Sequence, residues 1–248
     1  MRKTLIIGHR GAMGHAPENT RASFEAGVRL GADAVECDVH LSKEGRLVVI
    51  HDDRLDRTTD GRGAVSEKTW PEIRALDAGA WYGNAFAGER VWLLDEFLAW
   101  AKNRRTKSRA TLQVIVEIKS DPSAPVALAD RVVSLLRKTG MVRRSIVISF
   151  NHNEAARAKS LAPRLRTGLL FRQTPRDLVR RMGRTGADAV FPHFSLVAPP
   201  FMELARQRGW FVGTWTVNEI PDMKGLLKLE VDGMASNFPE KAVRLRSA

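Results

Sequence analysis

The feature that most constrains the fold of this chain is a regular alternation of short, β-branched apolar runs with longer segments of amphipathic pattern. Eight of the short runs are predicted as strands, and each of them except the last is followed by a predicted helix. Alternating strands and helices favour a parallel sheet, and eight such units favour a sheet closed into a barrel. A (β/α)8 barrel takes about 250 residues, so we expect these 248 residues to form one TIM-barrel domain over 1–248.

The pattern also predicts the bounds of the elements. Strands are predicted at 4–8, 33–39, 112–118, 145–149, 166–171, 188–192, 211–216 and 231–235. Helices are predicted at 19–30, 94–103, 124–138, 153–161, 175–183, 199–207 and 219–229. A further short strand, 46–51, is expected to form a hairpin with the second strand, and 241–248 is interpreted as a short basic tail. An open, doubly wound sheet is the alternative fold, but no GxGxxG fingerprint follows the first strand.

One long segment, 52–93, interrupts the alternation. It is rich in Gly, Asp and Trp, and only 67–76 has a helical pattern. A loop of this length is usually functional or forms structure of its own. We therefore expect an insertion subdomain at about 52–93, after the second strand and over the top of the barrel.

Composition limits the class of protein. The chain is 44% hydrophobic and 27% charged, which excludes a disordered or collagen-like protein. No apolar run approaches the roughly 20 residues needed to cross a bilayer. The single cysteine, Cys37, has no partner for an internal disulfide and suits a reducing compartment, so a cytoplasmic location is expected.

The net charge of +12 is concentrated in two segments, 101–109 and 157–184. A basic surface attracts anions, including nucleic acid and anionic membranes. No aromatic-and-basic RNA motif or zinc finger accompanies the charge, and no amphipathic anchor is evident. We therefore interpret both segments as solvated faces, and expect no nucleic-acid partner and no stable membrane association.

Three acidic residues are expected to converge inside the barrel. Side chains of a strand alternate between its faces, so Glu36 and Asp38 share one face, and Glu117 and Lys119 share a face of the next barrel strand. In a barrel these charged sets point inward at the C-terminal mouth. Burying three carboxylates is unfavourable without compensation. A hard divalent cation, Mg²⁺ or Ca²⁺, would compensate the charge; the alternative is neutralisation by Lys119, Arg10 and backbone donors without a metal.

Two histidines end strands in the same region. His9 follows the first strand and His51 ends the short strand of the hairpin. A pair of histidines suits general acid and general base catalysis near neutral pH. Arg10 and Lys119 are able to hold the oxygens of a phosphate group. The set as a whole suits phosphoryl chemistry.

These residues lie within motifs that resemble the glycerophosphodiester phosphodiesterase family. The motifs are HRGAMGHAPENT at 9–20, GADAVECDVHLSKEGRLVVIHDDRLDRTTDGRG at 31–63, and VEIK at 116–119. Two later pieces, VGTWTVNE at 212–219 and VDGMASNFP at 231–239, resemble the family's last two strand motifs. The combination is specific, although no single motif is. One departure is Trp92 in VWLLDEF, where members usually have a proline.

The resemblance implies a (β/α)8 barrel with a small insertion after the second strand. It implies metal-dependent hydrolysis of glycerophosphodiesters to an alcohol and sn-glycerol 3-phosphate. The residues that match the family's site are His9 and His51 as catalytic histidines, Glu36, Asp38 and Glu117 as ligands of one divalent cation, Arg10 and Lys119 as phosphate contacts, Trp215 on the glycerol side, and His193 as a polar residue facing the pocket.

Two other functions stay open at this point. One is a related barrel phospholipase that acts on lysolipid substrates at a membrane surface, with the basic segments as its docking face. The other is an anion-binding module without turnover, which would normally lack one of the matching residues; none is missing. The sequence indicates neither the head group of the substrate, nor the choice between Mg²⁺ and Ca²⁺, nor the oligomeric state.

Four further residues are given structural interpretations. Cys37 faces away from Glu36 and is expected in the core. Glu18 is expected to hold the first loop through Arg10. His40 and His152 are expected in solvated loops.

Overall fold

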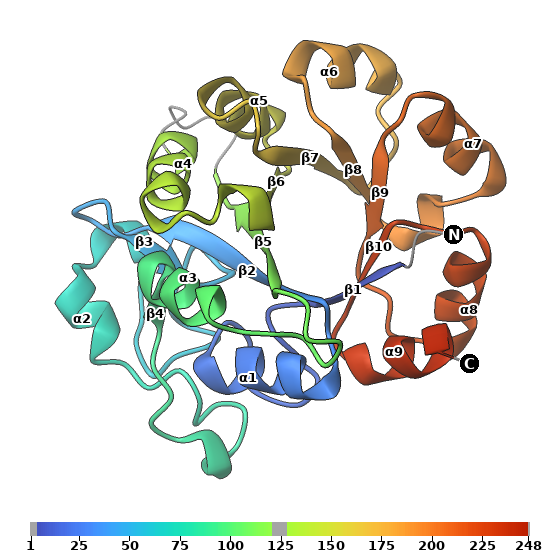
Figure 1. The fold of residues 1–248 in the computed structure, drawn as a ribbon. Coiled ribbons are helices and arrows are strands. Elements are labelled where there is room, and N and C mark those ends of the chain that lie inside the picture. Colours follow the sequence, from blue (N-terminus) through green and yellow to red (C-terminus); the bar gives the residue numbers. More distant parts are fainter. Residues whose placement is uncertain (1–3, 121–127, 248) are drawn as a thin grey trace.

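The predicted alternation of strands and helices folds into a closed barrel. The computed structural model describes residues 4–120 and 128–247 (Figure 1). Within these residues, eight parallel strands pair in the order β1, β10, β9, β8, β7, β6, β5, β2, and the pairing of β1 with β2 closes the ring. The (β/α)8 TIM barrel expected from the sequence is confirmed. The barrel strands are β1 (Leu5–Gly8), β2 (Ala34–Leu41), β5 (Gln113–Ile118), β6 (Ser145–Ser149), β7 (Arg166–Phe171), β8 (Ala189–Pro192), β9 (Phe211–Thr214) and β10 (Gly233–Ser236).

Helices surround the barrel on its outside (Figure 1). They are α1 (Arg21–Leu30), α3 (Leu94–Lys102), α4 (Leu128–Thr139), α5 (His152–Leu161), α6 (Leu178–Thr185), α7 (Pro199–Gln207), α8 (Ile220–Lys228) and α9 (Pro239–Ser247). Local signals set their ends. The Thr20 side chain accepts from the Ser23 N–H to cap α1, and Gly31 ends α1 with a φ of 100°. The predicted start of the 124–138 helix lies outside the described residues.

The interpretation of 241–248 as a mere tail is wrong, because α9 follows the last strand. Ala242 is buried in the core, and Val243 and Leu245 pack against it. Arg246 donates to the Asp33 carboxylate, which ties the helix to the loop before β2. In the sequence of α9, basic residues alternate with the few apolar ones, so its apolar stripe is too short to predict a helix.

Apolar side chains fill both sides of the strands. The outward residues of β2 and β5 pack against the helices, and Cys37 is fully buried among them, as predicted. The inward residues form a separate cluster inside the barrel, made of Ile7, Ala34, Ile115, Ile146, Ile148, Leu170, Ala189, Phe191 and Ala235. This apolar plug leaves only the C-terminal end of the barrel for polar side chains.

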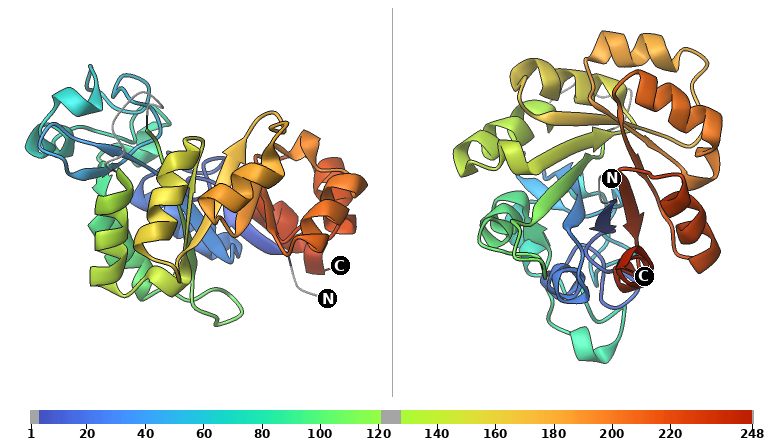
Figure 2. Two further views of the ribbon diagram at one scale, coloured as in Figure 1. Left: turned by 90° about the horizontal axis from the view of Figure 1, so that it is seen from above. Right: turned by 45° about the vertical axis from the view of Figure 1, so that its right-hand side comes forward.

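The insertion, residues 52–93, is built on an antiparallel extension of β2. Gly45, with a φ of 79°, turns the chain into β3 (Leu47–Val49), which pairs with β2 as the predicted hairpin. Next to β3 lies β4 (Trp92–Leu93), where the chain returns. Between them, the predicted helical segment forms the short α2 (Trp70–Arg74), flanked by the 3-10 turns Val65–Glu67 and Asn84–Phe86. The insertion stands at one side of the barrel's end (Figure 2), beside the mouth rather than across it.

No helix in the described part of the chain is long and apolar enough to span a membrane.

Candidate functional site

Three acidic side chains converge at the C-terminal end of the barrel, as the sequence predicted. Glu36 and Asp38 come from β2 and Glu117 from β5, and one carboxylate oxygen of each lies within 4.8 Å of the others. The strand register places Asp38 beside Glu117. The three residues are only 4%, 1% and 8% exposed. Strand alternation turns them inward while Cys37, between the first two, faces the helices.

Burial and mutual repulsion perturb this cluster strongly. Burial, with the Asp38 and Glu117 charges, raises the pKa of Glu36 well above its usual range. Burial and Asp38 raise the pKa of Glu117 to about 7. Burial also acts to raise the pKa of Asp38, but Lys119 and Arg10 outweigh it and hold that pKa below its usual range. When Glu36, Asp38 and Glu117 are all ionised, their three negative charges exceed the two positive charges of Lys119 and Arg10.

The residues fit a divalent cation. Lys119 Nζ lies 3.1 Å from Asp38 Oδ1 and 2.5 Å from Glu117 Oε1, so this lysine compensates part of the negative charge, as the alternative without a metal expects. Glu36 Oε2 accepts from the Arg10 N–H at 2.9 Å. Its other oxygen, Oε1, is buried and has no hydrogen bond or ion pair with any described residue. Buried carboxylate oxygens with an unfilled position suit hard cations such as Mg²⁺ and Ca²⁺.

The first loop holds Arg10 and Asp38 in place. Arg10 Nη1 donates to Glu18 Oε1 at 2.7 Å, which confirms the predicted link, and Arg10 Nε lies 3.3 Å from Asp38 Oδ2. Asn19, with a φ of 58°, donates from Nδ2 to Asp38 Oδ2 at 2.8 Å. Gly11 has a φ of 91°, and a Cβ there would lie 2.4 Å from the Ser23 backbone. The HRG and PENT motifs thus form a tight loop around one carboxylate.

His9 is the first residue after β1 and faces the acidic cluster. Its Nδ1 lies 2.8 Å from Asn237 Oδ1. An amide oxygen only accepts, so Nδ1 carries the hydrogen and Nε2 the lone pair. Burial and the Arg10 charge lower the pKa of His9 to about 4, which keeps the ring neutral at neutral pH. This state is able to accept a proton.

His51 is held by a carboxylate instead. Its Nδ1 lies 2.6 Å from Asp52 Oδ1, and its carbonyl lies 2.9 Å from His40 Nε2. Burial lowers the pKa of His51, although Asp38 acts to raise it. The structure thus supplies two imidazoles near one acidic cluster, each fixed through Nδ1.

Two residues predicted in solvated loops lie in regular structure. His40 belongs to β2 and contacts the His51 carbonyl. His152 begins α5, with its Nε2 3.0 Å from the Leu170 carbonyl. Both rings are partly buried, and each hydrogen-bonds a backbone carbonyl. In a solvated loop, water would take the place of these carbonyls.

Aromatic side chains form the opposite side of the mouth. Trp215, the first residue after β9, lines the same small cavity as His9, Glu36 and Glu117. Its Nε1 donates to the Phe191 carbonyl at 2.8 Å. His193, after β8, does not line that cavity but packs edge-on to Trp215, with ring centroids 5.5 Å apart. The structure thus brings Trp215 to the site and places His193 against the Trp215 ring.

Two further residues of this aromatic side, Phe150 and Arg172, were not predicted from the sequence. Phe150, the first residue after β6, is 41% exposed and meets the Trp215 ring edge-on at 5.4 Å. The guanidinium of Arg172, the first residue after β7, lies 5.0 Å from the Trp215 ring centroid and 5.8 Å from that of Phe150. Their positions could have identified them, because each directly follows a predicted strand, 145–149 or 166–171, whose end is correct.

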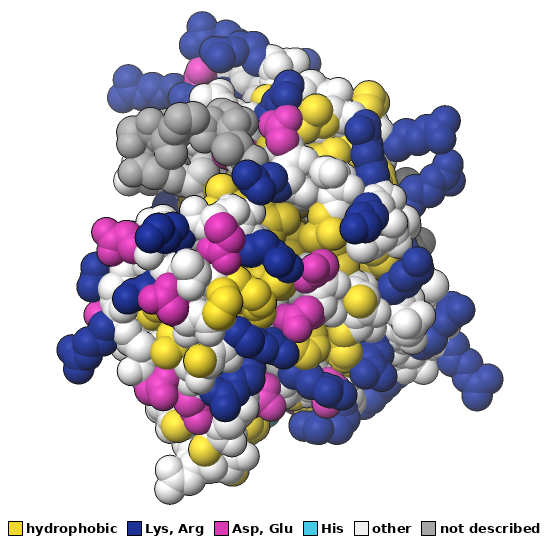
Figure 3. Space-filling model, turned by 90° about the vertical axis from the view of Figure 1, so that its left-hand side faces the viewer, with side chains coloured by type: hydrophobic (Ala, Val, Ile, Leu, Met, Phe, Trp, Pro, Cys, Tyr) yellow, Lys and Arg dark blue, Asp and Glu magenta, His cyan; other side chains and the backbone are white. Residues whose placement is uncertain are grey.

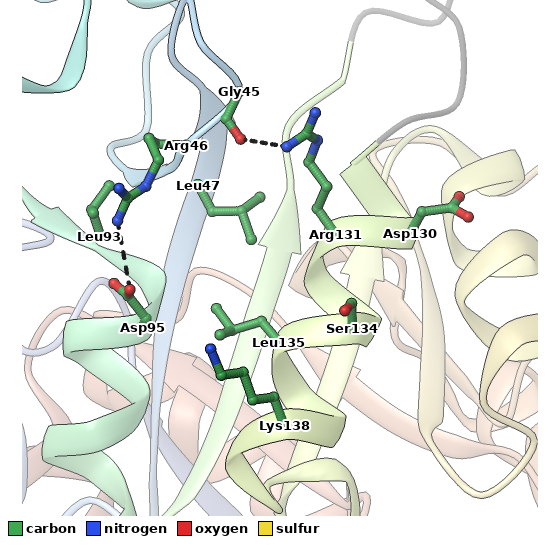
Figure 4. Close-up of a pocket in the computed structure, with 10 residues that line it drawn as sticks. All are labelled: Gly45, Arg46, Leu47, Leu93, Asp95, Asp130, Arg131, Ser134, Leu135 and Lys138. Carbon is green, nitrogen blue, oxygen red and sulfur yellow. Dashed lines mark hydrogen bonds and ion pairs between the residues drawn. The ribbon is translucent and has the colours of Figure 1, made fainter.

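A larger hollow lies on the outer surface and takes no part in this site. It is a groove of about 420 Å³ between α3, α4 and the β2–β3 hairpin. Two of its basic side chains contact other lining residues: Arg46 lies 3.7 Å from Asp95, and Arg131 donates to the Gly45 carbonyl (Figure 4). Figure 3 shows this side of the molecule, where apolar side chains lie among basic and acidic ones. The inward carboxylates of β2 point to the opposite face of the strand.

The departure at Trp92 lies outside the site. Trp92 is in β4 and packs against Phe24 and Trp100, with ring centroids 6.1 Å and 6.3 Å away. It therefore contributes to the contact between the insertion and the helices.

Comparisons with known proteins find one family. The model of the glycerophosphoryl diester phosphodiesterase family matches residues 9–241. A glycerophosphodiester phosphodiesterase of Caldanaerobacter subterraneus is 36% identical over 243 residues, which cover 98% of each chain. A solved phosphodiesterase of Oleispira antarctica, in complex with the product sn-glycerol-3-phosphate, is 27% identical with a TM-score of 0.89, covering 99% of this chain and 98% of that one. A glycerophosphodiester phosphodiesterase of Agrobacterium tumefaciens is 29% identical with a TM-score of 0.82, covering 99% and 100%.

Proposed function

Because this chain belongs to the glycerophosphoryl diester phosphodiesterase family, we propose that it hydrolyses glycerophosphodiesters to an alcohol and sn-glycerol 3-phosphate. It is a phosphoric diester hydrolase. The observation that carries the proposal is the buried convergence of Glu36, Asp38 and Glu117 beside two imidazoles and two cationic side chains. The product complex of the Oleispira relative supports the identity of the product.

Glu36, Asp38 and Glu117 are the proposed ligands of one divalent cation, Mg²⁺ or Ca²⁺. When bound, such an ion would balance the acidic cluster and stabilise negative charge on the phosphate oxygens. Arg10 and Lys119 are placed to hold the other phosphate oxygens, because each keeps donors beyond those in its present ion pairs. Together they orient the phosphodiester toward the histidines.

His9 and His51 are the proposed proton-transfer groups. One removes the proton from the attacking oxygen, and the other protonates the departing alkoxide. The attacking oxygen belongs to water or to the glycerol 2-hydroxyl, and detection of a cyclic phosphate would distinguish the two. Trp215 is the proposed wall against which the glycerol half packs. His193, edge-on to that ring, is the proposed polar substrate contact beside it.

The decisive experiment is an activity screen over a panel of glycerophosphodiesters that follows release of glycerol 3-phosphate. We expect turnover with added Mg²⁺ or Ca²⁺ and loss of turnover in EDTA, restored by adding the ion back. The panel also ranks the head groups. Absence of turnover on every diester with either ion would refute the proposed function.

Several expectations about context stay proposals. We propose that 1–248 is one TIM-barrel domain with the insertion as a subdomain, supported by the insertion's own apolar cluster around Leu55 and Ile73. A cytoplasmic location rests on the lone, buried Cys37. We propose a small-molecule substrate and neither a nucleic-acid partner nor stable membrane association.

A further inference from the structure

One arginine of the insertion contacts two carboxylates at the edge of the site at the same time. Arg57 donates from Nη1 and Nη2 to the two oxygens of Glu18, both at 2.8 Å. It also donates from Nε to Asp52 Oδ2 at 2.7 Å and from Nη2 to Asp52 Oδ1 at 3.0 Å. A guanidinium has donors on two edges of one rigid plane, and a lysine has no equivalent geometry.

Each of those carboxylates holds one of the proposed reacting groups. Glu18 Oε1 also accepts from Arg10 Nη1 at 2.7 Å, and Arg10 is the proposed phosphate contact. Asp52 Oδ1 is 2.6 Å from His51 Nδ1. Arg57 is therefore linked to the proposed phosphate contact, Arg10, through one carboxylate, and to the proposed proton-transfer group, His51, through another.

The contacts of Arg57 matter because Glu18 and Asp52 both depend on nearby positive charge. Glu18 is only 4% exposed, so its carboxylate depends on the cations beside it. Hydrogen bonds from Arg57 are the largest influence that lowers the pKa of Asp52, and they also fix the positions of both its carboxylate oxygens. An ionised Asp52 accepts the Nδ1 hydrogen of His51 and leaves Nε2 directed to the chemistry.

The insertion's own core fixes the loop that carries Arg57. Leu55, two residues before it, is 1% exposed and packs with Val65 and Ile73. The Thr59 N–H and hydroxyl both donate to the Leu55 carbonyl, at 3.1 Å and 2.7 Å. The turn is therefore anchored on both sides of the arginine.

We propose that Arg57 is a positioning residue through which the insertion sets His51 and Arg10 relative to one another. This inference rests on the proposed phosphodiesterase function and assigns the insertion a part in it. The insertion then has a part in catalysis, because through Arg57 it orients Arg10, which follows β1, and His51, which follows β3.

The test compares Arg57→Ala, Arg57→Lys and Arg57→Gln with the wild type on a natural diester. We expect kcat to fall by about 100-fold in the Ala and Gln variants, with a smaller change in KM, because small misplacements of reacting groups have effects of that order. Arg57→Lys should recover little, since a point charge cannot contact both carboxylates. Added guanidine should restore much of the activity of Arg57→Ala, because 44% of the Arg57 side chain is solvent-exposed and its site is open to a small cation.

Arg54→Ala is the matched control. Arg54 belongs to the same loop and pairs only with Asp56 among the described residues, so its loss should leave kcat unchanged. A proton NMR measurement gives a readout that does not need turnover. The Nδ1 proton of His51, 2.6 Å from Asp52 Oδ1, is expected downfield in the wild type, lost in Arg57→Ala and kept in Arg54→Ala.

The outcomes separate this inference from the function it rests on. A wild-type enzyme inactive on every diester refutes the proposed function and this inference with it. A wild-type rate in folded Arg57→Ala refutes the positioning role alone. A slow Arg57→Ala that guanidine does not restore, with the His51 proton signal unchanged, also refutes it and leaves Arg57 a structural residue.

Discussion

The mouth of the barrel has two unlike halves. The charged half, at the ends of β1, β2 and β5, carries His9, Arg10, Glu36, Asp38, Glu117 and Lys119. The aromatic half, at the ends of β6 to β9, carries Phe150, Arg172, His193 and Trp215. The two halves meet at one small cavity, which His9, Glu36 and Glu117 line from the charged half and Trp215 from the aromatic half. This arrangement suits a substrate with a charged phosphate and a less polar end.

The halves also differ in how their side chains are held. Asp38 is 1% exposed and accepts from or pairs with Asn19, Arg10 and Lys119. Phe150 is 41% exposed and is held by ring contacts, which have weak angular preferences. We therefore expect substitutions in the charged half to abolish or strongly reduce turnover, and substitutions in the aromatic half to change mainly binding.

The largest effect is expected at the metal cluster. Glu36→Gln or Asp38→Asn should abolish activity and weaken binding of the divalent cation, because each removes a charged oxygen ligand. Activity assays and calorimetric metal titration measure both effects, with circular dichroism to confirm the fold. Full activity of metal-stripped protein in chelator would contradict the proposed role of the cluster.

The histidines should follow. His9→Ala and His51→Ala are each expected to lower kcat by about 10²–10⁴-fold, the usual range for loss of a proton-transfer group. Metal affinity and thermal stability should change little.

A nitrophenol diester assigns the two roles. Its leaving group departs without protonation, so it should rescue the variant that lacks the general acid and not the one that lacks the base. Near wild-type rates in both variants on a natural diester would mean that neither histidine transfers a proton.

The aromatic half should give a smaller, binding-type effect. Trp215→Ala is expected to lower kcat/KM by about tenfold, mainly through KM, because it removes the ring that lines the cavity. Phe150→Ala should cost less, and Trp215→Phe should retain most of the binding. A fall in kcat as large as that of His9→Ala would remove the distinction between the halves.

The charged half should also leave a signature in the pH dependence of stability. In the metal-free protein, His9 has a pKa lowered to about 4 from 6.5. Between those values the unfolded chain binds a proton that folded His9 does not, so acidification destabilises the fold. Glu117, with a pKa raised to about 7 from 4.5, has the opposite sign, because its folded form binds the extra proton.

Denaturant unfolding at several pH values separates the two groups. His9→Asn should reduce the loss of unfolding free energy on acidification, and Glu117→Gln should increase it. Equal pH slopes in both variants and the wild type would show that neither pKa is shifted in the folded protein.

The smallest effect is expected at the basic residues of 101–109 and 157–184 that lie outside both halves. The interpretation of the whole of 157–184 as a solvated face is wrong at Arg172, which lies over the Trp215 ring in the aromatic half. Arg180 and Arg181 are 72% and 44% exposed and pair with Asp177 on the same helix. Surface pairs of this kind contribute about 0–1 kcal/mol. Arg180→Ala with Arg181→Ala should therefore leave kcat unchanged. Tight, activity-enhancing binding of the wild type to anionic vesicles would instead favour the lysolipid phospholipase.

The sequence by itself determined the features that follow from local periodicity. Alternating strands and helices predicted the barrel, and the two-residue period of β2 and β5 predicted that Glu36, Asp38 and Glu117 share the interior. The ends of the strands are informative as well. Six residues of the mouth are each the first residue after a barrel strand: His9, Lys119, Phe150, Arg172, His193 and Trp215. The position directly after a predicted strand points to Phe150 and Arg172, because the predicted strands 145–149 and 166–171 end where β6 and β7 end. It does not point to Trp215, because the predicted strand 211–216 extends past the end of β9.

Tertiary structure alone decided the contacts between segments that are distant in the chain. Arg57 joins Glu18 across 39 residues, and His9 meets Asn237 across 228. Likewise α9 is fixed by the Asp33–Arg246 pair and by apolar contacts that no short window contains. The physical reason is that strand and helix patterns arise from neighbouring residues, whereas a hydrogen bond between two loops exists only after the closed barrel has brought them within about 3 Å of each other.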